Sequence, residues 1–264
     1  MQPVLLQLGP VTFYSFGVFA ALAFAVGLYV TVQLARRDKL PLKHVFDYGL
    51  YVAIASLIGA RLWYLLFRPD ELDSFWELFT VGGGGLALPG GVAAGAAALI
   101  VALRRTGEPV RPWLDVAAVG TAVGLAVGKL GSLLNGDGFG AASSLPWAVE
   151  FTDSLAPGSV AGEALHPVQL YGFILLAVLA FGLWKLLERV RARRDWQPGS
   201  VFWAGLLGAS VIQLALEPFH SVLDALTFAG DDTARVIYPV AAAAAAGSAI
   251  MFYRLRGPVR RGPA

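Results

Sequence analysis

The sequence contains no cysteine and little charge, and both shortages narrow what the protein does. Without cysteine, the chain has no disulfide, no thiolate metal site and no cysteine nucleophile of its own. Its three histidines, His44, His166 and His220, are too scattered along the sequence to give a metal-ligand spacing. Only 14% of the 264 residues are charged and 57% are hydrophobic, which is too apolar for a soluble domain of this size. The composition therefore predicts a polytopic membrane protein.

Long apolar stretches dominate what is present. Seven of them are long enough to cross a bilayer as helices, which predicts an all-α fold with seven transmembrane helices. We expect one transmembrane domain over residues 1–264, with a small extracytoplasmic head region at about 136–166. The first residues carry no positive charge, so no cleavable signal peptide is predicted. The apolar stretches are 13–35, 45–67, 84–103, 113–135, 167–187, 199–216 and 236–253.

The basic residues predict the orientation of these helices. Of the 20 lysines and arginines, 16 fall on one side of the predicted bundle. By the positive-inside rule that side is cytoplasmic, so the N-terminus is expected outside and the C-terminus inside. The small net positive charge of the chain then comes from the basic residues on the cytoplasmic side of the membrane, and it does not indicate a nucleic-acid partner. The 16 residues are Arg36, Arg37, Lys39, Lys43, Arg104, Arg105, Arg111, Lys185, Arg189, Arg191, Arg193, Arg194, Arg254, Arg256, Arg260 and Arg261.

A lysine interrupts the fourth apolar stretch, and a glycine-rich turn follows it. A positive charge inside a membrane helix is costly unless water, a partner or a ligand compensates it. After Lys129 comes the segment 135–140 (NGDGFG), whose backbone amides can approach a ligand closely. The cation and the turn together predict a site for an anionic lipid headgroup, shaped by Asn135, Gly136 and Gly140.

Arg61 is the other cation that lies within an apolar stretch and outside the cytoplasmic set of basic residues. Arg61 and Lys129 each lie about 9 Å below the outer end of their helix, at a rise of about 1.5 Å per residue. Two cations at one depth could bind a single phosphate. Alternatively, each extends to the outer interface independently, with its stem against lipid. The neighbouring Gly59 and Gly131 favour the shared site, because glycines permit close helix approach.

The sixth apolar stretch ends in polar residues. Gln213 and Glu217 are four residues apart, so they share a helix face, and Gln213 is expected in the layer of the two cations. Glu217 is either a general base at the mouth of the site or an interfacial carboxylate ahead of Pro218. His220 is expected on the solvated surface.

The fifth apolar stretch opens with residues 166–171 (HPVQLY), where the proline suits the first helical position. Gln169 and Tyr171 are expected to enter the outer membrane layer. Tyr171 belongs either to the site or to an interfacial aromatic belt. His166 is a candidate base at the interface.

Two other features invite structural interpretation. The segment 82–91 is rich in glycine and contains Pro89, so it cannot make a regular helix. We expect it to line a cavity, or alternatively to form an outer loop ahead of a shorter helix. Asp47 and Asp115 lie near cytoplasmic helix ends and are expected at the interface.

Taken together, these motifs resemble the bacterial prolipoprotein diacylglyceryl transferases. The resemblance agrees in order and spacing over most of the chain. It implies a multi-pass enzyme of the bacterial plasma membrane, with a cavity that opens outward. The matching segments are 14–17, 59–67, 84–91, 129–140 and 166–171.

The resemblance also implies the reaction, which is transfer of a diacylglyceryl group from phosphatidylglycerol to the lipobox cysteine of a prolipoprotein signal peptide. The substrate brings the thiol, glycerol phosphate leaves, and neither a metal nor a cofactor is required. Arg61 and Lys129 are implied to bind the phosphate, while Asp137, Glu217 or His166 assists proton transfer. The remaining substrate-binding residues implied are Ser132, Asn135, Gly136, Gly140, Gln169, Tyr171 and Gln213.

The chain departs from the family pattern at several positions. Pro89 stands where the family has a histidine, and Lys129 and Gln213 stand where it has arginines. Ser132 and Asp137 replace an asparagine and a glutamate. These departures also suit a relative that binds or senses anionic phospholipid without transferring it. A solute transporter is a third class, for which paired ionisable residues at the bilayer midplane and an internal repeat would be expected.

Overall fold

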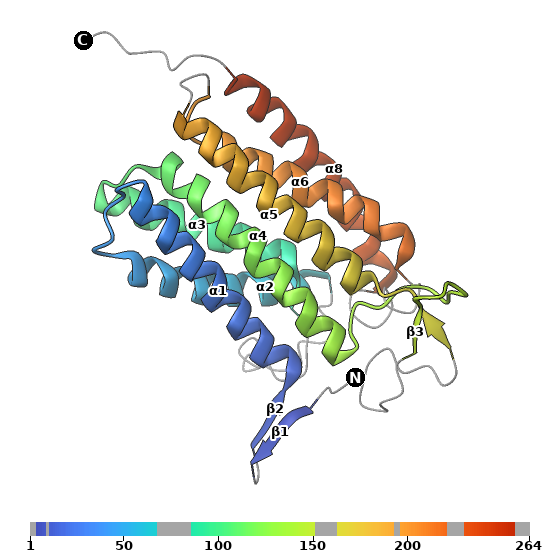
Figure 1. The fold of residues 1–264 in the computed structure, drawn as a ribbon. Coiled ribbons are helices and arrows are strands. Elements are labelled where there is room, and N and C mark those ends of the chain that lie inside the picture. The colour runs from blue at the N-terminus through green and yellow to red at the C-terminus, as the bar shows by residue number, and fades with distance from the viewer. Residues whose placement is uncertain are drawn as a thin grey trace, which may run out of the picture.

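Seven long helices make up most of the described chain (Figure 1). The structure is a computed structural model that describes residues 4–8, 11–67, 86–150, 163–192, 196–220 and 230–256. Residues 82–85 of the glycine-rich segment lie outside the described residues, as do Arg193, Arg194, Arg260 and Arg261.

The helices follow the predicted apolar stretches. Among the described residues, six helices are long and apolar enough to cross a membrane, so the chain is a multi-pass membrane protein. A membrane span formed by the last helix, α8, stays a prediction. The helices are α1 (Ser15–Arg37), α2 (Val45–Phe67), α3 (Leu88–Thr106), α4 (Val110–Asn135), α5 (Val168–Ala192), α6 (Ser200–Leu216), the 3₁₀ turn η3 (Glu217–Phe219) and α8 (Gly230–Arg254). The strands β1 (Val4–Leu8), β2 (Val11–Tyr14), β3 (Val149–Glu150) and β4 (Ala164–Leu165) form two antiparallel hairpins.

Two helix starts differ from the prediction. Residues 11–14, which are β-branched or aromatic, pair with β1, so α1 begins at Ser15 and not at residue 13. The expectation of broken backbone is wrong for residues 88–91, because they form the regular first turn of α3. Pro89 is tolerated there because the N–H groups of a first turn have no partner within the helix.

Helix α4 is central to the bundle. It packs against α1, α5 and α6, and α8 packs against α6. Glycines bring α1 and α4 close together: a Cβ on Gly27 would lie 2.9 Å from the carbonyl oxygen of Gly120. A Cβ on Gly124 would lie 2.8 Å from the carbonyl oxygen of Ala23. Such close packing drives helix association in a bilayer, where lipid is as apolar as the side chains.

Helices α2 and α3 form a pair that joins the rest of the bundle at one end. Within the pair, Gly59 and Gly90 bring the two backbones into direct contact. At the joining end, a shared apolar core spans the end of α1, the start of α2, the end of α3 and the start of α4. There Tyr48 packs edge-on against Trp113, with ring centroids 5.7 Å apart, and its hydroxyl lies 2.7 Å from Thr106 Oγ1.

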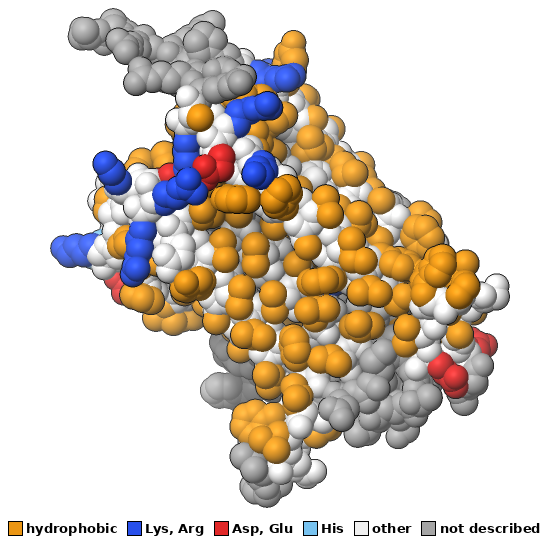
Figure 2. All heavy atoms as spheres, viewed as in Figure 1, with side chains coloured by type: hydrophobic (Ala, Val, Ile, Leu, Met, Phe, Trp, Pro, Cys, Tyr) orange, Lys and Arg blue, Asp and Glu red, His pale blue; other side chains and the backbone are white. Residues whose placement is uncertain are grey.

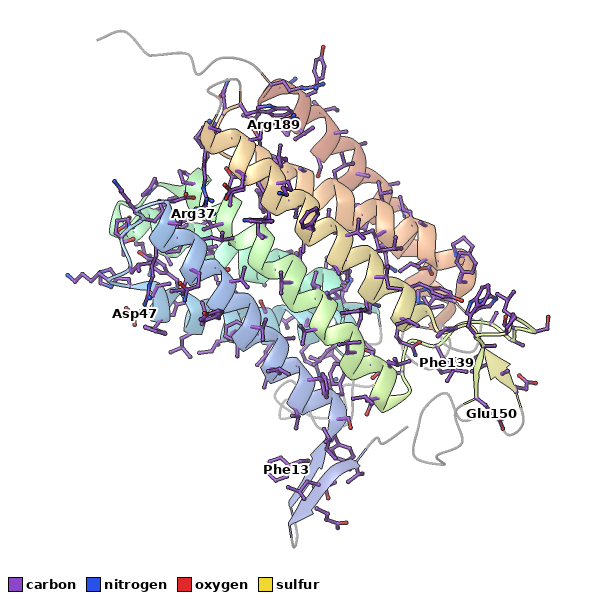
Figure 3. The ribbon with its side chains drawn as sticks, viewed as in Figure 1. Phe13, Arg37, Asp47, Phe139, Glu150 and Arg189 are labelled. Atoms are coloured by element: carbon purple, nitrogen blue, oxygen red, sulfur yellow. The ribbon has the colours of Figure 1, made fainter. Side chains whose placement is uncertain are left out.

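Basic side chains gather at this same end, next to the apolar flanks of the bundle (Figure 2). Arg37 and Arg189 lie there, on α1 and α5 (Figure 3). An ion-pair network holds these two helix ends together: Arg37 Nη1 and Arg191 Nη1 lie 2.7 and 2.8 Å from Glu188 Oε1. Arg191 Nε lies 2.5 Å from Asp38 Oδ1. The gathering agrees with the charge asymmetry of the sequence, and its cytoplasmic location stays a prediction.

Asp115 lies inside the bundle, a placement that the sequence did not indicate, and its depth at the membrane interface stays a prediction. Its side chain is buried, and its two carboxylate oxygens accept hydrogen bonds from the backbone N–H groups of Gly199 (2.6 Å) and Phe202 (2.9 Å). These donors lie at the start of α6, where N–H groups have no partner within the helix. A side chain from α4 therefore caps α6. Asp47, in contrast, is exposed, and its Oδ2 lies 3.2 Å from His44 Nδ1.

The close contact of α1 and α4 predicts that Gly124→Leu destabilises the protein. The added side chain would meet the backbone of Ala23 and force the helices apart, at a cost of about 1–3 kcal/mol. Thermal unfolding in detergent measures the loss. Gly182→Leu is the matched control, because no atom lies within 4 Å of a Cβ at Gly182. Equal unfolding midpoints for the two variants would contradict the proposed packing.

The capping of α6 predicts that Asp115→Ala lowers the free energy of unfolding by about 1–3 kcal/mol, because two backbone donors lose a buried acceptor. The thermal midpoint of the variant checks this. Asp47→Ala removes a carboxylate from an exposed helix end and should change the midpoint little. A loss in Asp47→Ala as large as that in Asp115→Ala would refute the capping role.

Candidate functional site

Three chain segments meet at the end of the bundle opposite the basic residues. They are the turn after α4, the start of α5 and the end of α6. Backbone hydrogen bonds join them: the Gly140 N–H donates to the His166 carbonyl, and the Ala141 N–H donates to the Phe219 carbonyl, both at 2.9 Å. Gly140 also bridges to His220. A Cβ at Gly140 would lie 2.5 Å from His166 Cβ and 2.6 Å from the Phe219 carbonyl oxygen, so only glycine fits.

A small head region covers this junction. Leu165 of β4 packs against Phe139, both residues are buried, and Val149 of the paired strand β3 packs against them. Figure 3 places Phe139 at this end, remote from Arg37 and Arg189. Part of the predicted 136–166 segment, residues 151–162, lies outside the described residues.

The turn that follows α4 is built around Asp137. Gly136 ends the helix in the left-handed conformation, with φ 79°, and its N–H donates to the Ser132 carbonyl at 2.9 Å. The Asp137 side chain is only 8% exposed, and Asn135 Nδ2 donates to its Oδ2 at 2.7 Å. Gln169 Nε2, from the start of α5, donates to the Asp137 backbone oxygen at 2.7 Å. The turn is therefore fixed by side chains of both flanking helices.

Burial raises the pKa of Asp137 above the ordinary range of an aspartate. Hydrogen bonds from Ser132 and Asn135 oppose the rise, and so does the positive charge of Lys129. The desolvation of the carboxylate outweighs these three effects, so the carboxyl group keeps its proton to a higher pH than an exposed aspartate.

Lys129 occupies a groove on α5 and acts on two carboxyl groups. A Cβ at Gly172 would lie 3.1 Å from Lys129 Cε, so the missing side chain at Gly172 makes room for the lysine stem. The ammonium group interacts electrostatically with both Asp137 and Glu217. The lysine charge within α4 therefore acts on carboxyl groups at the ends of α4 and α6, on which the hydrogen bonds of each carboxyl group act more strongly.

Glu217 is the polar centre of the α6 end. Gln213 Nε2 donates to Glu217 Oε2 at 3.1 Å, which confirms that the two side chains share a face. His220 Nδ1 lies 3.6 Å from the same oxygen. The His220 side chain is only 17% exposed, so the expectation that His220 is a solvated surface residue is wrong.

Aromatic side chains pack beside this polar cluster. The rings of His166, Tyr171 and Phe219 meet edge to face, with centroids between 5.6 and 6.3 Å apart. The Tyr171 hydroxyl accepts a hydrogen bond from Trp147 Nε1 at 2.8 Å and lies 3.4 Å from His166 Nδ1. Tyr171 is therefore joined to the head region. An apolar groove of about 390 Å³ between α5 and α6 is lined by Tyr171, Ile174, Leu175, Ala215, Leu216 and Phe219.

Two of these aromatic residues were not expected from the sequence. Trp147 lies in the head region, and the signal for it was an indole directly after Pro146, outside any apolar stretch. Phe219 follows Glu217 by two residues, within the turn that Pro218 starts. Neither belongs to a sequence motif with evident chemistry, so only the packing revealed them.

Arg61 lies on α2, away from the close contacts that were expected to join it to Lys129. The expectation that the glycines beside the two cations allow them to share a site is wrong, because Gly59 packs against α3 and Gly131 packs against Phe19 of α1. These glycines therefore do not bring α2 and α4 together. Arg61 itself is 8% exposed, and its guanidinium lies 5.7 Å from the centroid of the Tyr64 ring. Sharing of one phosphate by Arg61 and Lys129 stays a prediction.

The raised pKa of Asp137 predicts how stability changes with pH. The unfolded chain releases this proton near the ordinary aspartate value, and the folded protein holds it to higher pH. The folded state therefore loses stability as pH rises from about 4 through the raised pKa. We expect the thermal midpoint of the unmodified protein to fall relative to that of Asp137→Asn between about pH 4 and pH 7. Glu150→Gln, at an exposed strand position, is the control, and a rise in place of the fall would contradict the assignment.

A family model and the most similar curated proteins identify the same family. A model of the family described as prolipoprotein diacylglyceryl transferase matches residues 3–253. The chain is 27% identical over 263 residues to the phosphatidylglycerol–prolipoprotein diacylglyceryl transferase of Synechococcus elongatus, covering 96% of this chain and 88% of that protein. It is 32% identical over 226 residues to the protein of the same name from Parasynechococcus marenigrum, covering 81% and 78%. It is 29% identical over 227 residues to the protein of the same name from Fusobacterium nucleatum, covering 72% of this chain and 78% of that protein. This chain belongs to the prolipoprotein diacylglyceryl transferase family.

Proposed function

We propose that this protein transfers a diacylglyceryl group from phosphatidylglycerol to the lipobox cysteine of prolipoproteins, as the names of its relatives state for them. The supporting observation is the cluster of Lys129, Asp137 and Glu217, assembled from the ends of α4 and α6 at one end of an apolar bundle. A lysine whose charge acts on two carboxyl groups, at the end of the bundle that also carries an apolar groove, suits a ligand with a phosphate and acyl chains.

The reaction requires stabilisation of a phosphate leaving group. The sulfur of the substrate cysteine attacks the glyceryl carbon that carries the phosphate ester, so a C–S bond forms as the C–O bond breaks. Glycerol phosphate leaves with the electron pair of that bond. Lys129 binds the phosphate and offsets its developing charge. Arg61, on α2, is the second cation that we assign to the phosphate.

A base must take the proton of the substrate thiol, because a free thiol is mostly protonated at neutral pH. We assign this role to Glu217, which lies at the end of α6 beside His220. Asp137 is held by Asn135 and Ser132, so its carboxyl group orients the turn around the headgroup. His166, hydrogen-bonded to Tyr171, is the alternative base.

The remaining site residues shape the binding surface. Gln169 is fully buried and bonds to the backbone of Asp137, so it positions the turn against which the substrate binds. Tyr171 lines the apolar groove. The headgroup contacts that we propose are Ser132, Asn135, Gly136, Gly140 and Gln213.

This function sets the membrane placement that we propose. The site end of the bundle faces the outside of a bacterial plasma membrane, and the basic end faces the cytoplasm. The N-terminus is then outside, α8 crosses as the seventh span, and residues 1–264 form one domain with its head region above the membrane. The signal peptide of the prolipoprotein reaches the site from within the bilayer.

The direct test combines the purified protein, phosphatidylglycerol vesicles and a lipobox peptide. We expect the peptide to gain the mass of one diacylglyceryl group, measured by mass spectrometry. Lys129→Ala should lower the rate about 100-fold or more, because the leaving phosphate loses its cation. Lys129→Arg keeps the charge and should retain most of the activity.

Lys185→Ala is the matched control, because it removes a lysine at the basic end of α5, where the ammonium stacks on Trp184 at 4.8 Å. Its transfer rate should be unchanged. The absence of any mass gain, under conditions in which a relative of the same family modifies the peptide, would reject the proposed activity.

A further inference from the structure

The N-terminal part of the chain carries no charged side chain. No aspartate, glutamate, lysine or arginine occurs among residues 1–35, and Arg36 is the first charged residue. This stretch contains the β1–β2 hairpin, and β2 runs directly into α1 at Ser15. Soluble proteins protect the exposed edges of their strands with charged side chains, and this hairpin has none. Its composition therefore points to surroundings other than water.

Apolar side chains cover the hairpin and stay exposed in the fold. Leu5, Leu6, Phe13 and Tyr14 are between 42% and 55% exposed. Leu6 lies opposite Phe13 in the register of the two strands, so their side chains form an apolar pair on one face. Of the described elements, only α1 makes more than slight contact with the hairpin. An exposed apolar surface of this kind marks a contact with a partner or with a membrane.

The apolar surface of the hairpin continues into that of α1. Leu5, Leu6, Phe13 and Val18 line one groove of about 250 Å³, and Val18 belongs to the first turn of α1. Val18 and Leu22 are four residues apart, so they share a helix face, and both are exposed. Because α1 is long and apolar enough to span a membrane, this face is expected to contact acyl chains. The hairpin and the helix thus present one continuous apolar face.

Two features favour the membrane interface for the hairpin over the hydrocarbon layer. A sheet of two strands leaves the outer edge of each strand without a strand partner within the described residues, and open edges do not occur in hydrocarbon. Gln7 and Thr12 face each other across the strands and add a polar pair. Figures 1 and 3 show the hairpin, with Phe13, at the end of α1 that is remote from Arg37 and the basic end.

We propose that the β1–β2 hairpin is an interfacial anchor, whose apolar face inserts into the lipid leaflet on the site side of the membrane. Leu5, Leu6 and Phe13 lie at the boundary between acyl chains and headgroups, and Tyr14 directs its hydroxyl towards water. The partner of this surface is the bilayer itself. Continuity with the lipid-facing side of α1 favours lipid over a second copy of the chain or another protein.

The anchor is connected to the candidate site through the start of α1. Phe19, in the second turn of α1, packs against Gly131 of α4, which lies between Lys129 and Ser132. The start of α1 is therefore held by lipid on one side and by the end of α4 on the other. An anchor at this point fixes the depth at which the end of α4 meets the headgroup layer.

The test uses the absence of cysteine, which allows one fluorescent label at a chosen position. Leu6→Cys, Leu57→Cys and Lys43→Cys are each labelled with a nitrobenzoxadiazole group, and the proteins are placed in lipid nanodiscs. Leu57 is exposed near the middle of α2 and reports the hydrocarbon layer, and Lys43 is exposed between α1 and α2 and reports water. Quenching is measured with iodide in water and with phospholipids that carry a nitroxide near the headgroup or deep in the acyl chain.

We expect the shallow nitroxide to quench the label at Leu6 about threefold more than the deep one, and iodide to quench it about a third as much as at Lys43. The label at Leu57 should show the opposite preference between the two nitroxides. Strong quenching by iodide at Leu6 would overturn the proposal, because the hairpin would then stand in water. Protection from iodide without quenching by lipid would also overturn it, because protein would then cover this face.

A charge on the hairpin provides a second, independent readout. Phe13→Asp places a carboxylate opposite the label at Leu6 and should lower quenching by the shallow nitroxide about threefold, while quenching by iodide rises. Phe13→Leu keeps the face apolar and is the matched control, in which both values should stay near those of the label alone. An unchanged pattern in Phe13→Asp would contradict insertion of this face into lipid.

Discussion

The structure depends on the accommodation of one lysine inside a membrane helix. Lys129 interrupts α4, and its charge acts electrostatically on carboxyl groups in the turn after α4 and at the end of α6. This interaction requires that three chain segments stay together, and backbone hydrogen bonds around Gly140 and His166 hold them. The residues of the candidate site therefore also contribute to the packing at this end of the bundle.

The two ends of the bundle use opposite means of stabilisation. At the basic end, a continuous apolar core, the Arg191 ion pairs and the Asp115 cap hold several helices together. At the site end, small residues and polar contacts replace that core, and the α2–α3 pair meets its neighbours mainly at the basic end. This arrangement leaves polar groups in the layer where a phospholipid headgroup and its acyl chains would lie.

Family membership and local chemistry constrain different aspects of function. The family gives the reaction class, because the match covers nearly the whole chain. The structure adds the local arrangement: Gln213 bonds to Glu217 without adding charge, and the charge of Lys129 acts on both Glu217 and Asp137.

The sequence by itself determined the helices, because bilayer-length apolar stretches must satisfy their backbone groups internally. It also determined the clustering of basic residues and the pairing of Gln213 with Glu217, since helix spacing fixes which side chains share a face. Only the tertiary structure decided that Gly59 and Gly131 face different helices, that Asp115 caps α6 and that His220 lies beside Glu217. These are contacts between segments far apart in the chain or across a turn, and local periodicity carries no information about which helix becomes the neighbour of which.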